Sequence, residues 1–211
     1  MRLRDMLIVF GIMLVWGANF VVSKLGLVEF PALLMMAIRF TLTAAVMVPF
    51  VRVPPRRTWP HYALLSLSIG SLHYGLMFSG LKMTDASTAA ILIQLQVPFA
   101  ALLAAAVLND RLGWRRSLGM AIAFAGIVLI VGEPKIGGDP LALSLVLAAG
   151  FIWAIANVQI KWAAAHGHEM DPFALSAWVA VLAAPQLWLL TATVETDQMT
   201  AMREASWIGW G

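Results

Sequence analysis

The amino-acid sequence predicts an all-α polytopic membrane protein, and two observations support this. The chain of 211 residues is 61% hydrophobic and 12% charged, with a mean hydropathy of +0.85, whereas roughly 25% of residues are charged in a soluble domain. The charged residues also gather between long apolar runs instead of within them. Strands of a membrane β-barrel would be shorter and would alternate in polarity, so we expect helical spans.

Several apolar runs are long enough to cross a bilayer, because a helix needs about 20 residues for the roughly 30 Å hydrocarbon core. The first follows the charged segment 1–5 and continues to Ser23, longer than the apolar region of a signal peptide. Breakers separate the later runs, among them Pro54-Pro55, Gly137-Gly138-Asp139-Pro140 and Asp171-Pro172. We expect seven transmembrane helices, over residues 6–26, 31–51, 62–81, 86–108, 115–132, 141–161 and 172–194.

The distribution of lysine and arginine predicts the orientation. With the N-terminus inside, nine basic residues lie in the inner segments and four in the outer ones. By the positive-inside rule this is a multi-pass protein of the cell inner (plasma) membrane with a cytoplasmic N-terminus. The net charge of +3 comes without a basic patch of interleaved aromatic residues, so the expected partner is the lipid bilayer and not nucleic acid. The absence of cysteine excludes disulfides and thiolate metal sites.

The first and sixth spans share a pattern. In both, Trp and Lys stand eight residues apart with an Asn between them, at Trp16–Lys24 and at Trp153–Lys161. Each copy is followed by a short loop and a span that opens with proline, at Pro31 and Pro172. Five spans separate the two starts, and an odd number turns the second copy upside down. This predicts inverted repeats, an architecture of many transporters whose substrate site lies near the midplane between the repeats.

Short motifs also occur in a fixed order: Trp16-Gly17-x-Asn19-Phe20, Arg39-Phe40, Ala86-Ser87-x-Ala89, Pro98, Asp110-Arg111-Leu112 and Gly119-x6-Gly126. Together they resemble the EamA family of the drug/metabolite transporter superfamily, and most closely its O-acetylserine/cysteine exporter branch. The resemblance implies a transporter of ten helices in two five-helix repeats. One departure is mild: the family usually has Glu at the position of Asp110.

On this resemblance, residues 1–132 form a first repeat of five helices and 133–140 form a linker. Residues 141–211 would then be an incomplete second repeat, with two helices and the entrance to a third at 207–211. Three spans of the family pattern are expected to be missing. An inactive truncated fragment is therefore an alternative, as is completion by a partner chain, for example in a homodimer.

Arg39 is the only charged residue well inside any of the long apolar runs. An arginine at mid-bilayer costs about 2.5–3.5 kcal/mol on insertion scales and is usually retained for a function. No carboxylate lies within a predicted span, which favours a role for Arg39 as partner of an anionic substrate group. A structural role stays open, in which Arg39 bonds carbonyls of a neighbouring helix or reaches a water defect.

Polar and aromatic side chains supply the other candidates for a transport path. Trp153 and Asn157 share one helical face, and Asn19 lies about one turn after Trp16. These residues could line a central cavity. Equally, an Asn could join neighbouring helices and a Trp could pack at the membrane interface.

The fourth and third spans add three candidates. Gln94 and Pro98 lie four residues apart, and the proline frees a carbonyl near position 94. Such a kink suits a gate or a binding site, although packing among small residues explains it as well. His73 could shuttle a proton near neutral pH or serve only as a packing residue.

Enzyme motifs such as Gly-x-Ser-x-Gly, the P-loop and His-Glu-x-x-His are absent from the sequence. We therefore expect no enzyme activity, no catalytic residue, no cofactor and no metal. The resemblance implies export of small amino-acid-like metabolites of the cysteine or O-acetylserine type. Transport would proceed by alternating access, driven by a gradient or by exchange. The alternatives are a broader drug or metabolite efflux protein and, with less support, a membrane-embedded lipid-modifying enzyme.

Overall fold

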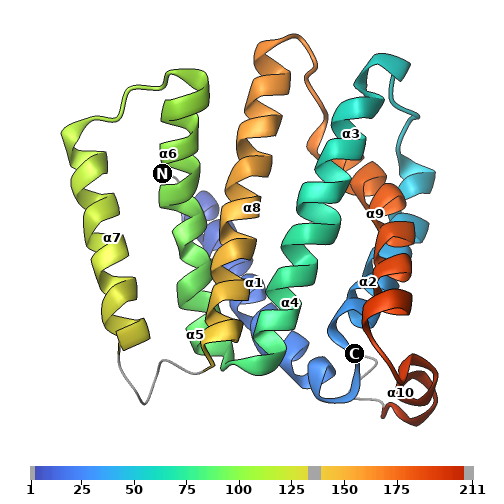
Figure 1. Ribbon diagram of the computed structural model, residues 1–211. Helices are drawn as coiled ribbons and strands as arrows, with labels where there is room; N and C mark the ends of the chain where they lie inside the picture. Colours follow the sequence, from blue (N-terminus) through green and yellow to red (C-terminus); the bar gives the residue numbers. More distant parts are fainter. Residues whose placement is uncertain (1–2, 133–138, 207–211) are drawn as a thin grey trace.

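The structure is a computed structural model that describes residues 3–132 and 139–206, and within these ranges it contains helices and loops but no strand (Figure 1). The predicted all-α polytopic fold is confirmed. In chain order the elements are α1 (Leu3–Glu29), α2 (Ala32–Met47), η1 (Val48–Phe50), η2 (Arg56–Thr58), α3 (Trp59–Leu65), η3 (Ser66–His73), α4 (Tyr74–Met83), α5 (Ala86–Leu92), η4 (Ile93–Leu95), α6 (Gln96–Leu108), α7 (Trp114–Gly132), α8 (Pro140–Ala165), α9 (Pro172–Val194) and α10 (Gln198–Glu204).

Six helical stretches in the described ranges are long and apolar enough to cross a membrane. Two of them, Ala86–Leu108 and Pro172–Val194, have the predicted bounds, whereas the third, Arg56–Met83, begins earlier than predicted. The fifth predicted span, 115–132, is a helix, α7, of 19 residues, but it is not among these six. Residues 133–138 of the predicted linker and the predicted helix entrance at 207–211 lie outside the described residues.

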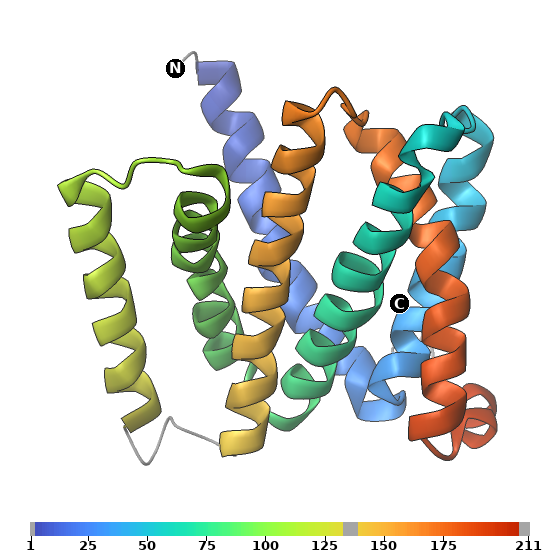
Figure 2. The same cartoon turned by 45° about the horizontal axis from the view of Figure 1, so that its top comes forward.

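The helices pack around α8, which lies between α4 and α6 (Figure 1). On one side of the bundle α2 packs along α9, and on the opposite side α7 lies beyond α6. The long helix α1 crosses behind them and runs in the direction opposite to α8 (Figure 2). Inverted repeats would require this opposite direction, and the repeat itself stays a prediction.

The bundle has two ends, which we name after residues. The Glu29 end carries the corner between α1 and α2, the turn at Thr84 and the short helix α10 (Figure 1). The Arg57 end carries η2, the loop between α6 and α7, and the loop between α8 and α9. Under the predicted orientation, the Glu29 end faces the outside of the cell.

The main buried core lies in the half of the bundle nearer the Glu29 end. It joins α1, α2, α4, α5, α8 and α9, and members such as Leu27, Met36, Leu81, Val146 and Leu187 are each at most 2% exposed. Between helices in a bilayer, close van der Waals packing replaces the hydrophobic effect as the main attraction. The core therefore fixes the relative positions of these six helices near one end of the bundle.

The third span is not a continuous α-helix, because its middle segment η3, Ser66–His73, is π-helical. Such segments are rare and frequently occur at functional sites. The hydroxyl of Ser68 donates to the carbonyl of Leu64 at 2.9 Å. A Cβ atom added to Gly70 would overlap with the Cβ of Ala183 on α9. Gly70 thus allows a close approach between the backbone of this segment and α9.

The fourth span is interrupted by the 3₁₀ turn η4, Ile93–Leu95, between α5 and α6. Pro98 has no N–H group and cannot bond the carbonyl of Gln94 in the α-helical pattern. The 3₁₀ turn ends at Leu95, three residues before this proline. The irregularity therefore falls where the sequence predicts a kink.

Candidate functional site

Arg39 lies on α2, and two side chains of α1 hold its guanidinium group. Nη1 donates a hydrogen bond of 3.1 Å to Oγ of Ser23, and Nη2 donates one of 3.1 Å to Oδ1 of Asn19. Ser23 is only 1% exposed. The ring of Phe78 on α4 lies 5.4 Å from Cζ of Arg39, a distance at which cation–π attraction contributes. Arg39 thus joins three helices by polar contacts inside the bundle.

Both hydrogen-bond partners of Arg39 are neutral, so they occupy N–H groups without cancelling the positive charge. A guanidinium carries five N–H donors, and these two bonds leave others for a ligand. A carboxylate that reached the group would make charge-assisted hydrogen bonds, which are roughly twice as strong as neutral ones and can be bidentate. Arg39 is therefore equipped to bind an anionic group that enters from solution.

Two cavities lie beside this contact. The first, which we call the Trp16 cavity, has a volume of about 100 Å³, and its lining includes Trp16, Asn19, His73 and Gln96. The second, the Asn157 cavity, has a volume of about 380 Å³, and its lining includes Arg39, Thr43, Asn157 and Ser176. Tyr74 and Trp153 line both cavities. These two aromatic side chains therefore separate one cavity from the other.

Five predicted path residues meet at these cavities. Trp16 and Asn19 line the first cavity, Arg39 and Asn157 line the second, and Trp153 lines both. The side-chain amide of Asn157 donates to the carbonyl of Trp153 at 2.9 Å. The two copies of the Trp-Asn pattern thus contribute to neighbouring spaces, although they lie far apart in the sequence.

Gln94 and Pro98 do not line either of the two cavities. Gln94 is exposed, and Pro98 is buried in the packing of α6. Gln96, by contrast, is 8% exposed and lines the Trp16 cavity. Gln94 and Gln96 are two residues apart, and such residues lie on nearly opposite faces of a helix. Only Gln96 therefore faces the cavity.

His73 is 5% exposed and lies among aromatic rings. Its Nδ1 donates to the carbonyl of Ala149 at 2.8 Å, and since a carbonyl can only accept, the hydrogen is on Nδ1. The ring centroid of His73 lies 4.9 Å from that of Tyr74 and 4.7 Å from that of Trp153. His73 therefore has a packing role in the wall of the Trp16 cavity, and proton transfer by it stays a prediction.

One polar contact inside the bundle, between η3 and α9, was not predicted from the sequence. Nε2 of Gln186 donates to Oγ of Ser66 at 2.9 Å, and Oε1 of the same amide accepts from Oγ of Ser71 at 2.7 Å. The available signal is the group of serines in the run Ser66–His73 of an otherwise apolar span. Such contacts bind helices together in lipid, where each is worth about 0.6 kcal/mol on average.

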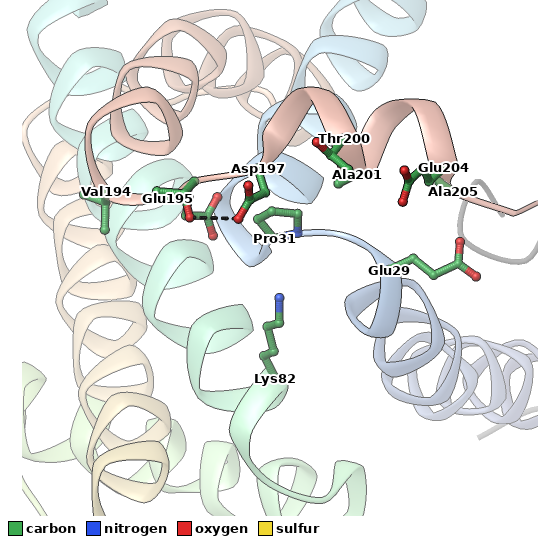
Figure 3. Close-up of a pocket in the computed structure, with 11 residues that line it drawn as sticks. Glu29, Pro31, Lys82, Val194, Glu195, Asp197, Thr200, Ala201, Glu204 and Ala205 are labelled. Atoms are coloured by element: carbon green, nitrogen blue, oxygen red, sulfur yellow. Dashed lines mark hydrogen bonds between the residues drawn. The ribbon is translucent and has the colours of Figure 1, made fainter.

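A larger hollow of about 670 Å³ lies at the Glu29 end (Figure 3). Its lining includes the charged residues Glu29, Lys82, Glu195, Asp197 and Glu204, and Lys82 points toward Pro31. Glu29 accepts hydrogen bonds of 2.6 Å from the N–H and the hydroxyl of Ser206. Glu195 accepts bonds of 2.8 and 3.0 Å from the N–H groups of Leu33 and Leu34. Both carboxylates thus fasten the segment after α9 to the corner between α1 and α2.

Comparison with known proteins decides the family. Residues 3–132 match the model of the EamA-like transporter family. This chain belongs to that family. The resemblance drawn from the motifs between Trp16 and Gly126 is confirmed, since all of these motifs lie in the matched part.

Curated relatives carry the names of transporters. The chain is 32% identical over 188 residues to the "Probable amino-acid metabolite efflux pump" of Salmonella typhimurium, over 86% of this chain and 62% of that protein. It is 30% identical to the protein of the same name in Escherichia coli, with the same coverage. It is 23% identical to the "Uncharacterized inner membrane transporter YedA" of Escherichia coli, over 98% of this chain and 69% of that protein. The chain thus spans about 62% of the length of the first two relatives.

The family and its relatives are named as transporters and not as enzymes, in agreement with the sequence. Within residues 3–132 and 139–206, no group of three or more His, Cys, Asp or Glu side chains is placed to hold a metal ion. The contacts of the Arg39 guanidinium are two hydrogen bonds to neutral side chains and one cation–π contact.

Proposed function

We propose that this chain exports small amino-acid-like metabolites and that Arg39 binds the carboxylate of the transported solute. The observation that carries the proposal is the neutral hydrogen bonding of Arg39 by Asn19 and Ser23 at 3.1 Å each. The names of the two efflux-pump relatives support the solute class. Cysteine and O-acetylserine are the first solutes to test, because the motifs resemble that exporter branch.

The volumes of the two cavities favour one of them as the binding site. Small-molecule sites usually measure about 300–1,000 Å³, and the Asn157 cavity, at about 380 Å³, falls in this range while the Trp16 cavity, at about 100 Å³, does not. A zwitterion in the Asn157 cavity would place its carboxylate on Arg39. Its ammonium group would then find the ring faces of Tyr74 and Trp153.

Transport by alternating access fits this arrangement. Movement of one five-helix repeat against the other would expose the Asn157 cavity to each side of the membrane in turn. The sequence has no P-loop, so we propose that a gradient or exchange drives transport. If protons are coupled, His73 is the candidate carrier, because it lines the Trp16 cavity beside Trp153.

The aromatic lining favours a second candidate function. Trp16, Phe20 and Phe78 line the Trp16 cavity together with the shared Tyr74 and Trp153, and such a lining suits lipophilic solutes. A broad efflux protein would carry cationic drugs that gain nothing from Arg39. Drug susceptibility of expressing cells separates the two candidates, because only the broad exporter should lower it.

An efflux assay tests the proposal. Cells that express the chain are loaded with labelled cysteine, O-acetylserine and other amino acids, and release is followed. Arg39→Ala should lower release about tenfold or more, since hydrogen bonds to a charged group are worth roughly 1.5–3 kcal/mol. Arg39→Lys keeps the charge but loses the planar fork, so its loss should be partial. Arg203→Ala, which removes an exposed arginine on α10, should export normally. Normal export by Arg39→Ala would overturn the assignment.

A further inference from the structure

Lys24 on α1 binds the C-terminal end of α4. Its Nζ donates to the carbonyls of Leu81 at 2.7 Å, of Lys82 at 3.0 Å and of Thr84 at 2.7 Å. The last carbonyls of a helix have no partner within that helix, and a cation there is also favoured by the helix dipole. An ammonium group has three donors, and in Lys24 each has a carbonyl partner. The lysine therefore caps a helix that begins 50 residues later in the sequence.

The place of Lys24 on α1 gives this cap a further consequence. The buried residues of α1 are Ser23, Gly26 and Leu27, all close to Lys24 in the last third of the helix. Asn19 and Ser23, which hold Arg39, lie on the same stretch. A slip of α1 by one residue would move these groups by about 1.5 Å and rotate them by about 100°, which breaks hydrogen bonds of 3.1 Å.

We propose that Lys24 is a positioning residue for the Arg39 site. Its three bonds fix the height and the rotation of α1 on α4, so that Asn19 and Ser23 meet Arg39. They also close the Trp16 cavity toward the Glu29 end, because α1 and α4 both line that cavity and Leu81, whose carbonyl Lys24 binds, is one of the lining residues. The link to transport rests on the proposed function, whereas the closure of the cavity can be measured without any solute.

Lys82 offers a matched control. It lies at the same end of the bundle, and its Nζ donates to the carbonyl of Phe30 at 3.2 Å. It is exposed and projects into the hollow of Figure 3. Removal of its ammonium group changes the charge of this end by the same amount as removal of that of Lys24. It leaves the three hydrogen bonds of Lys24 in place, because the atom of Lys82 that Lys24 contacts is the main-chain carbonyl.

The absence of cysteine from the chain allows a clean labelling experiment. Met77 on α4 is 4% exposed and lines the Trp16 cavity, so Met77→Cys places a single thiol behind the proposed closure. Its labelling by a membrane-impermeant thiol reagent is followed on right-side-out and inside-out vesicles. Lys24→Met should raise the rate of labelling from the Glu29 side about tenfold. This factor corresponds to the free energy lost with hydrogen bonds to a charged group. Lys24→Arg, which keeps a cationic donor, should raise it far less, and Lys82→Met should leave it unchanged.

A second thiol distinguishes positioning from general loosening of the fold. Leu65→Cys lies at a site that is 1% exposed in a separate cluster with Ala156 and Val179. Positioning by Lys24 predicts faster labelling of Met77→Cys alone. Equal acceleration at both thiols, or none at Met77→Cys, would overturn the proposal. Labelling could behave as expected while Arg39→Ala exports normally. Lys24 would then still position α1, and only the proposal that Arg39 binds the solute carboxylate would fail.

Discussion

Asn19 and Ser23 accept hydrogen bonds from Arg39 and carry no charge, and this pairing decides what the cavity can bind. A carboxylate at either position would neutralise the guanidinium permanently and occupy the N–H groups that a solute would need. An amide and a hydroxyl hold the group in place and leave its charge available. For binding of a solute carboxylate, the neutrality of the two partners is therefore as important as the arginine itself.

Asn19→Asp tests this reasoning with a nearly isosteric change. The new carboxylate would stand 3.1 Å from Nη2 of Arg39 and form an ion pair in the bilayer interior. We expect efflux to fall about tenfold or more because the solute must compete with a charge-assisted bond, while the thermal stability of the purified protein is kept or increased. Asn109→Asp makes the same chemical change at an exposed residue in the left-handed region, with φ of 53°, and should behave as the parent. Full efflux by Asn19→Asp would show that the charge of Arg39 is not needed.

The sequence could identify Arg39 because a lone charge in an apolar run is costly and easily recognised. It could not identify the partners of Arg39, since these depend on how α1 lies across α2. Gln96 illustrates a different limit. Whether Gln94 or Gln96 faces the Trp16 cavity depends on which side the fourth span turns toward its neighbours, and the apolar run around both residues gives no sign of this.

Among the elements, α2 begins without a cap of its own. Its N-cap residue is Pro31, which makes no side-chain hydrogen bond to the helix. Glu195, which directly follows α9, supplies both carboxylate oxygens to the N–H groups of Leu33 and Leu34 and also accepts from Thr191 at 2.7 Å. The end of α9 thus stabilises the start of α2, the helix that carries Arg39.

Glu195→Ala should therefore destabilise the protein. Loss of an N-cap costs about 0.5–2 kcal/mol, and the carboxylate also complements the helix dipole. Thermal unfolding in detergent should show a lower midpoint, with a smaller change for Glu195→Gln, which keeps one acceptor. Glu204→Ala, at the exposed end of α10, serves as control. An unchanged midpoint for Glu195→Ala would contradict the capping role.

The close packing between η3 and α9 predicts that a side chain at position 70 destabilises the protein. Gly70→Ala would place its Cβ against that of Ala183, and overpacking of this kind costs about 1–3 kcal/mol. Adding Ala183→Gly should recover much of the lost stability, because it removes the clashing atom. Gly126→Ala, with nothing within 4 Å of the added atom, should not destabilise. If the double variant does not recover stability, the contact between residues 70 and 183 is not the cause of the destabilisation.

Some elements were predictable and others were not. The sequence predicts that a span opens at Pro172, and Pro172 is the first residue of α9. Asp171 was predicted only as part of a breaker, and its Oδ1 also caps the helix by accepting from the N–H of Ala174 at 2.8 Å. The π-helical bonding of η3 has no periodic signature in the sequence. The short helix α10 is polar and offered no apolar pattern to detect.

For the whole molecule, composition together with the long apolar runs between the charged residues was sufficient for the fold class, because membrane-spanning helices need such runs. The family followed from the order of short motifs, each of which is weak alone. The convergence of Trp16 and Asn19 with Trp153 and Asn157 needed the structure, since it depends on the packing of α1, α4 and α8. The five-helix repeats and the direction of transport stay predictions at this scale.

The predicted orientation can be measured with single thiols. Thr196→Cys lies at the Glu29 end and Gly113→Cys in the loop between α6 and α7 at the Arg57 end. With a cytoplasmic N-terminus, an impermeant reagent should label Thr196→Cys in intact cells and Gly113→Cys only after the membrane is opened. The reverse pattern would show that the excess of nine basic residues over four does not set the orientation.

The proposal that Arg39 binds the carboxylate of the solute can be tested directly by removing the charge from that carboxylate. In proteoliposomes, uptake of a transported amino acid and of its carboxamide is compared for the parent and for Arg39→Gln. The parent should prefer the acid by roughly 10- to 100-fold, the size expected for a charge-assisted contact, and Arg39→Gln should lose nearly all of this preference. If Arg39→Gln distinguishes acid from amide as well as the parent does, the Arg39 guanidinium and the solute carboxylate are not coupled. Arg39 then does not bind the carboxylate.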